Sequence, residues 1–106
     1  MGGSWEGFAL DAVVSRLAAR PEECFFWATH SGAELDLLVV RGSRRLGFEF
    51  KRTTAPAVTR SMRAALLDLR LDELVVVHAG SRSQNLDRKI RAISLDRILK
   101  YVPGPR

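Results

Sequence analysis

Apolar residues recur at helical spacing in two parts of the chain. Over residues 4–19 they form one stripe, which consists of Leu10, Val13, Val14 and Leu17. Ser4 is a suitable N-cap and Arg20-Pro21 a suitable end, so the pattern predicts a helix there. A second helix is predicted over residues 59–69, where the apolar positions are Met62, Ala65, Leu66 and Leu69.

Between these helices, short apolar runs predict strands. Three strands are expected over residues 24–29, 34–41 and 44–53, with turns at Ser31-Gly32 and Gly42-Ser43. Connections as short as these favour an antiparallel meander.

After a break at Ala55-Pro56, the second half of the chain adds a parallel strand. An apolar run over residues 74–79 is typical of a buried strand. A strand, a helix and a strand in succession imply a right-handed crossover. The remaining predicted elements are a polar loop over residues 79–87, an edge strand over 89–93 and a helix over 95–101. This order predicts an α/β fold in which one mixed sheet is flanked by helices.

Composition limits the class of protein. The chain has 106 residues, 46% of them hydrophobic, which suits a single domain over residues 1–106 with its own core. No run approaches the roughly 18 apolar residues that span a membrane, and no signal-peptide pattern is present. Cys24 is the only cysteine, which excludes an internal disulfide and a cysteine zinc cluster. We expect a cytoplasmic protein, and the abrupt start inside a helix suggests a fragment of something longer.

The charge favours a polyanionic partner. Lys and Arg number 17 against 12 Asp and Glu, so the net charge is +5, and nucleic acid is the first candidate. An ordinary arginine-rich surface explains the same balance. Arg52, Arg60 and Arg63, on or near the third strand and the second helix, are accordingly either phosphate contacts or part of a solvated face.

An acid and a base share one face of the third predicted strand. Side chains two apart on a strand point the same way, so Glu49 and Lys51 lie together while Phe48 and Phe50 point to the other face. An isolated Glu-x-Lys pattern is common, and an exposed charge pair is its simplest explanation.

Asp36 makes the pattern more specific, because it interrupts an otherwise apolar strand in which aspartate is disfavoured. A hairpin about Gly42-Ser43 pairs residues whose numbers sum to about 85, so Asp36 is expected opposite Glu49. A cation between the two carboxylates would relieve their repulsion. The alternatives are that Asp36 pairs with Arg52 or faces solvent.

Glu6 is the third candidate acid. It falls one turn before Leu10, near the centre of the apolar stripe, and so is expected to point toward the sheet. Its alternative role is that of a first-turn acid favoured by the helix dipole. Carboxylates on a rigid sheet and a helix are ligands that suit Mg²⁺ or Mn²⁺, and Lys51 beside them could orient a water or stabilise a phosphate.

These residues together carry a family resemblance. An acid on the first helix, Asp36 on the second strand and Glu49-x-Lys51 on the third resemble the PD-(D/E)XK nuclease superfamily, which includes restriction endonucleases and archaeal Holliday junction resolvases. The chain looks most similar to a domain that follows an AAA-type ATPase module in many bacterial and archaeal proteins. The stretches that carry this second likeness are Ser4-Trp5-Glu6-Gly7-Phe8, Gly32-Ala33-Glu34-Leu35-Asp36-Leu37, Gly47-Phe48-Glu49-Phe50-Lys51-Arg52-Thr53 and Ala55-Pro56.

The resemblance implies a restriction-endonuclease-like αβββαβ core and a function. Glu6, Asp36 and Glu49 would be the metal ligands, and Asp36, Glu49 and Lys51 the catalytic residues; Leu35 stands where the superfamily has a proline. The implied activity is Mg²⁺- or Mn²⁺-dependent hydrolysis of nucleic acid, DNA first, by a homodimer. The alternative is a non-catalytic nucleic-acid- or protein-binding module of the same fold, accessory to an AAA-type ATPase.

The remaining aromatic and histidine residues have simpler expected roles. We expect packing in the core for most of Trp5, Phe25, Phe26 and Trp27, rather than stacking on bases. His30 and His78 are not at metal-ligand spacing; His78 is expected to be structural and His30 to lie in a turn.

Overall fold

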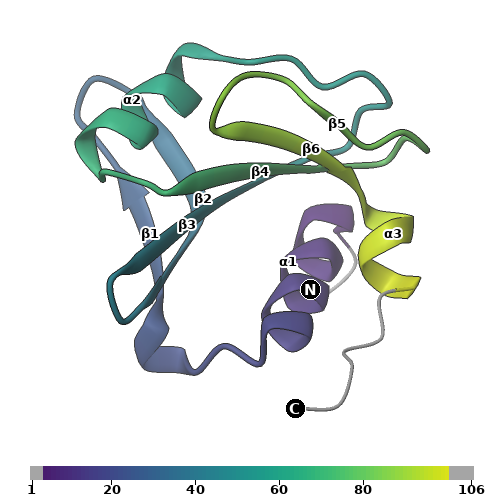
Figure 1. Ribbon diagram of the computed structural model, residues 1–106, viewed down its shortest axis with the longest axis horizontal. Helices are drawn as coiled ribbons and strands as arrows, with labels where there is room; N and C mark the ends of the chain where they lie inside the picture. Colours follow the sequence, from purple (N-terminus) through teal and green to yellow (C-terminus); the bar gives the residue numbers. More distant parts are fainter. Residues whose placement is uncertain (1–3, 101–106) are drawn as a thin grey trace.

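The computed structural model describes residues 4–100 and shows one mixed sheet with helices on both faces (Figure 1). The elements in chain order are α1 (Trp5–Leu17), the 3-10 helix η1 (Pro21–Glu23), β1 (Cys24–Ala28), β2 (Glu34–Arg41), β3 (Arg44–Lys51), α2 (Arg60–Asp68), β4 (Glu73–His78), β5 (Gln84–Asn85), β6 (Ile90–Ser94) and α3 (Leu95–Lys100). The α/β class with a mixed sheet is therefore confirmed. The predicted helix end at Tyr101 and the tail after it lie outside the described residues.

The six strands lie in the order β1-β2-β3-β4-β6-β5. β1, β2 and β3 form the predicted antiparallel meander, and β3, β4 and β6 run parallel. β6 was expected at an edge, but it lies between β4 and the two-residue strand β5. β5 was predicted as loop because Gln84-Asn85 is short and polar, and only its pairing with β6 makes it a strand.

The two faces of the sheet bury separate cores. α1 and α3 cover one face and α2 covers the other (Figure 1). The buried residues on the α1/α3 face are Ala9, Val13, Leu37, Val39, Phe48, Phe50, Val75, Val77 and Leu95. Those on the α2 face are Leu35, Leu38, Met62, Ala65, Leu71, Leu74, Val76 and Ile90. Residues of β3 and β4 alternate between these cores, as a sheet buried on both sides requires.

Helix α1 is capped as predicted but is rotated relative to the expected orientation. The Ser4 hydroxyl accepts a hydrogen bond from the Gly7 N–H at 2.9 Å. The fully buried positions are Ala9 and Val13, whose small side chains let the helix approach the sheet closely. Glu6 is exposed, so the prediction that it points toward the sheet is wrong. Packing against the sheet, rather than the centre of the sequence stripe, determines which face is buried.

The register of β2 changes beside the candidate acid. Leu37 pairs with Phe48, as the predicted sum of 85 requires, and the recorded β2–β3 pairs end there. Against β1 the register shifts between the Phe25 and Trp27 pairs, leaving one extra residue in β2. Leu35 consequently packs in the α2-side core although Leu37 packs on the other face. Bulges of this kind redirect side chains and recur beside functional sites.

None of the helices within residues 4–100 is long and apolar enough to cross a membrane.

Candidate functional site

A cavity of about 240 Å³ lies on the α2 face, at the end of β3. It is lined by Gly32, Glu34, Asp36, Glu49, Lys51, Thr59 and Ser61. Asp36 comes from the bulged part of β2, Glu49 and Lys51 from the same face of β3, and Thr59 from the start of α2. The structure thus brings three of the four predicted catalytic and metal-binding residues to one place.

Asp36 and Glu49 join the two strands where the recorded backbone pairing ends. The Asp36 N–H donates to Glu49 Oε2 at 3.1 Å, and the Phe50 N–H donates to Asp36 Oδ2 at 2.9 Å. Each carboxyl group therefore accepts a hydrogen bond from a backbone N–H of the neighbouring strand, as a backbone carbonyl does in a regular sheet. The expected facing of Asp36 and Glu49 is realised through these two bonds, and no ion pair between Asp36 and Arg52 is found among residues 4–100.

Glu49 holds its proton unusually strongly for a carboxyl group. Glu49 is only 5% exposed. Burial, and after it the negative charge of Asp36, raises the pKa of Glu49 to about 7, against the opposing effects of the Asp36 N–H and Lys51. The Lys51 ammonium, on a half-exposed side chain, lies 3.6 Å from Glu49 Oε1. A perturbed carboxyl group in a cavity is a recognised feature of functional sites.

The donor set fits one hard divalent cation that keeps much of its water shell. Asp36 Oδ1 accepts no hydrogen bond from the rest of the described chain, and Glu49 Oε1 is engaged only by Lys51. Mg²⁺ is typically bound by one or two carboxylates together with waters and substrate phosphate oxygens. Within residues 4–100 no cluster of three or more Asp, Glu, His or Cys side chains could hold a metal, so any site here rests on two.

The fourth predicted ligand, Glu6, is not part of this arrangement. It is exposed on the first turn of α1 and does not line the cavity. α1 packs on the opposite face of the sheet, with Ala9 and Val13 against it. The structure therefore supports a two-carboxylate site and gives Glu6 no place in it.

The three predicted nucleic-acid contacts differ in their surroundings. Arg52 and Arg60 are exposed and form no ion pair with any residue in the described range. Arg52 follows Lys51, and Arg60 stands between the cavity residues Thr59 and Ser61. Arg63 instead binds Asp87 at 2.8 Å, which ties α2 to the loop before β6.

Sequence reasoning missed the polar residues that complete the cavity. Thr59 is the N-cap of α2, and its hydroxyl accepts from the Met62 N–H at 3.2 Å. The start of a helix carries partial positive charge, so Thr59 and Ser61 place a favourable anion environment opposite the carboxylates. In the sequence, the only sign of these residues is Thr59, a suitable helix N-cap shortly after the break at Pro56.

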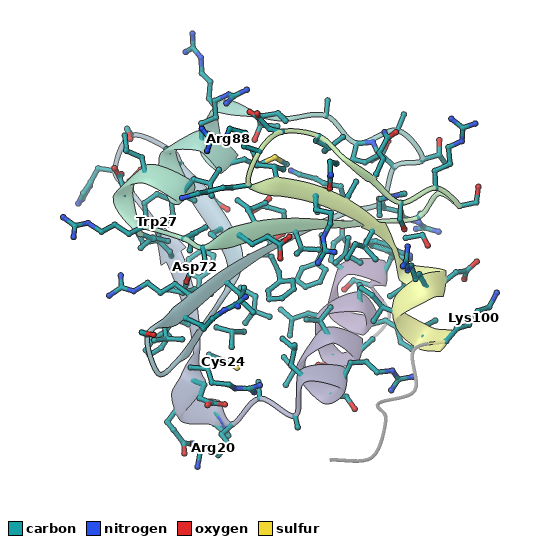
Figure 2. The ribbon with its side chains drawn as sticks, viewed as in Figure 1. Arg20, Cys24, Trp27, Asp72, Arg88 and Lys100 are labelled. Carbon is teal, nitrogen blue, oxygen red and sulfur yellow. The ribbon has the colours of Figure 1, made fainter. Side chains whose placement is uncertain are left out.

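Two of the four aromatic residues depart from expectation. Trp5 and Trp27 pack against the two cores. Phe25 and Phe26, on the edge strand β1, are 49% and 67% exposed, so the expectation that most of the four pack in the core is wrong. Cys24, labelled in Figure 2, is half-buried beside the α1/α3 core, and no sulfur chemistry is indicated.

The side chain of His78 is buried, and one of its two ring nitrogens has no hydrogen-bond partner within residues 4–100. It is buried at the end of β4, opposite Lys51 in the register. Its Nδ1 accepts from the Gly80 N–H at 3.0 Å, and its buried Nε2 has no partner among residues 4–100. A side chain on Gly80 would approach Thr54 O within 2.8 Å, so glycine allows this close packing.

Comparison with known proteins identifies a family without a described activity. Residues 1–98 match the family model described as "Domain of unknown function (DUF4143)". Uncharacterized proteins of Mycobacterium bovis and of Mycobacterium tuberculosis are each 43% identical over 99 residues, which cover 93% of this chain and 22% of the relative. The chain therefore spans about a fifth of the length of these relatives. No solved structure matches it significantly. On the extent of the family match, the chain belongs to the DUF4143 domain family.

Proposed function

We propose that the cavity is the active site of a divalent-metal-dependent nuclease with a PD-(D/E)XK, restriction-endonuclease-like core. The observation that carries the proposal is the meeting of Asp36, Glu49 and Lys51 in one cavity, with Glu49 buried and its pKa raised to about 7. Two carboxylates can hold a divalent cation, and a lysine beside them can stabilise negative charge on a phosphate.

The roles follow from position. Asp36 and Glu49 would hold Mg²⁺ or Mn²⁺ through the oxygens that their cross-strand bonds leave available. A bound cation would supply a polarised phosphate and a more acidic water. Lys51 would orient the attacking water or stabilise the additional negative charge on the phosphate, because its ammonium lies beside Glu49 at the cavity.

Nucleic acid, DNA first, is the proposed substrate. Arg52 and Arg60 flank the cavity and have no acidic partner within the described range, so both are free to contact phosphates. An AAA-type ATPase module and a homodimer remain proposed partners that rest on the sequence resemblance. The relatives have room for a further module, since the matched region is 22% of their length.

Calorimetric titration with Mn²⁺ tests the site without a guess about the substrate. We expect binding to the wild type, and none to the Asp36→Asn, Glu49→Gln double variant. Asp96→Asn is the matched control, because Asp96 is an exposed acid on α3 and should leave binding unchanged. Mn²⁺ that binds the double variant as well as the wild type would refute the metal site.

Proton release sharpens the same experiment. Because Glu49 keeps its proton up to about pH 7, metal binding at pH 6 should release about one proton. Titrations in two buffers of different ionisation enthalpy measure that number.

Lys51→Ala should bind Mn²⁺ but lose cleavage of DNA substrates, and unchanged cleavage in this variant would remove the catalytic role of Lys51.

A second function is favoured by one specific observation. Both carboxyl groups already accept backbone hydrogen bonds that join β2 to β3, which is sufficient reason for their presence. The domain would then be a non-catalytic nucleic-acid- or protein-binding module. Salt-sensitive DNA binding that survives Asp36→Asn, with no metal-dependent cleavage, would support this alternative.

A further inference from the structure

A second hollow lies on the opposite face of the sheet and has no role in the proposed chemistry. Its volume is about 500 Å³, and it lies between α1, α3 and the strands β3, β4 and β6. The floor is apolar and consists of Leu46, Phe48, Val75 and Ile93. Four arginines and a single acid, Glu73, also line it; the arginines are Arg16, Arg41, Arg44 and Arg91. We call this hollow the arginine groove.

Within residues 4–100, three of the four guanidinium groups have partners and one does not. Arg16 donates to the carbonyls of Ile98 and Leu99 at the end of α3. Arg91 pairs with Glu73 at 3.1 Å, and Arg41 binds Glu23 and the Leu17 carbonyl. Arg44, which begins β3, makes no side-chain hydrogen bond or ion pair within residues 4–100. The groove therefore presents net positive charge and one guanidinium that is available to an anion.

The shape of the groove favours a narrow ligand. Phe48 and Val75 line it and yet are only 6% and 4% exposed. An α-helix about 10–12 Å across would rest on the arginine side chains and would not reach this floor. The half-buried Leu46 and Ile93 are the part of the floor that an alkyl chain can contact. A hollow of this size falls within the range of small-molecule sites, which is roughly 300–1,000 Å³.

We propose that the arginine groove binds a small organic anion with an aliphatic body and a carboxylate head. The aliphatic part would lie on Leu46 and Ile93, and the carboxylate would pair with Arg44. Burial of the alkyl chain supplies affinity, and the excess of arginine over acid selects the sign of the head group. This site is independent of the carboxylate cavity, because alternate residues of β3 point to opposite faces of the sheet.

Titration of the whole chain with octanoate, followed by nuclear magnetic resonance of backbone and methyl groups, tests the proposal. We expect shifts at Leu46 and Ile93, and binding at least about fivefold weaker for octanol and for octylammonium. Arg44→Gln should weaken octanoate binding by a similar factor. Arg88→Gln is the matched control, because Arg88 lies on the α2 side, away from α1 and α3 (Figure 2).

The outcomes separate this site from the proposed nuclease. The Asp36→Asn, Glu49→Gln double variant should bind octanoate like the wild type, whether or not it binds metal. The proposal is overturned if no shifts occur at Leu46 and Ile93, or if Arg88→Gln weakens binding as much as Arg44→Gln. Equal binding of inorganic phosphate would show that the apolar floor contributes nothing, and would overturn it as well. Tighter binding of an acidic helical peptide than of octanoate would replace the small anion by a protein partner.

Discussion

The two faces of the sheet differ in chemical character, although the same strand, β3, contributes residues to both. On the α2 face, β3 presents Glu49 and Lys51 in a small polar cavity. On the α1/α3 face, the alternate residues Phe48 and Phe50 belong to an apolar core, and the arginine groove lies over part of it. Strand periodicity alone separates the two environments, which are one side chain apart in sequence.

The two faces differ in how their residues affect the stability of the fold. The α1/α3 face gains stability from aromatic and aliphatic burial, while the cavity on the α2 face holds a carboxyl group whose charged form is disfavoured. Glu49 is therefore a cost to the fold at neutral pH that a bound cation would offset. Substitutions on the two faces should change the free energy of unfolding by different amounts. Only at the cavity should that change depend on pH or on metal.

The largest expected effect is the loss of Phe50 from the α1/α3 core. Phe50→Ala should lower the free energy of unfolding by about 3–5 kcal/mol, because a buried aromatic ring is removed and a cavity remains. Urea unfolding followed by circular dichroism measures the change. Phe50→Leu is the matched control and should recover most of the loss; equal losses in both variants would mean that ring volume is not what Phe50 contributes.

The pH dependence of stability isolates the other face. The pKa of Glu49 is about 7 in the folded chain and near 4.5 when the chain is unfolded. Between these values the folded state binds more protons, so stability falls as pH rises from about 4.5 to 7 and then levels off. The shift corresponds to roughly 3 kcal/mol. Unfolding midpoints in urea at pH 5 and at pH 8 measure this loss.

Glu49→Gln separates this contribution from those of the other acids. Glutamine keeps an oxygen that can accept the Asp36 N–H but cannot ionise, so the difference between pH 5 and pH 8 should shrink. Saturating Mn²⁺ should also reduce that difference in the wild type, because it stabilises the ionised carboxylate. A wild type and a Glu49→Gln variant with the same pH dependence would show that Glu49 titrates normally.

Much of the fold followed from local patterns, and the failures arose where distant residues decide. The meander, the crossover strand and the facing of Asp36 and Glu49 were predicted from turns, apolar runs and register arithmetic. The central position of β6 was not, because strand order is a tertiary property. The orientation of Glu6 failed because close packing of Ala9 sets the rotation of α1.

Asp36 provides the next prediction, of intermediate size. Asp36→Ala removes the acceptor for the Phe50 N–H and should cost about 1–3 kcal/mol, since a partly buried donor loses its partner. Asp36→Asn keeps an acceptor oxygen and should cost less, although it should weaken the proposed metal binding. Unfolding in urea measures both variants. If Asn were as damaging as Ala, the charge of Asp36 and not its hydrogen bond would be what the fold requires.

The smallest effect is expected at the edge where the two faces end. Phe26 is 67% exposed on β1, so Phe26→Thr removes little buried surface and replaces one good strand former by another. The free energy of unfolding should change by no more than about 0.5 kcal/mol, as at other exposed positions. Urea unfolding of Phe26→Thr beside Phe50→Ala provides the comparison on one scale. A loss of 2 kcal/mol or more, on the order of a core substitution, would mean that Phe26 packs against part of the protein in solution, and that the edge of the sheet is covered.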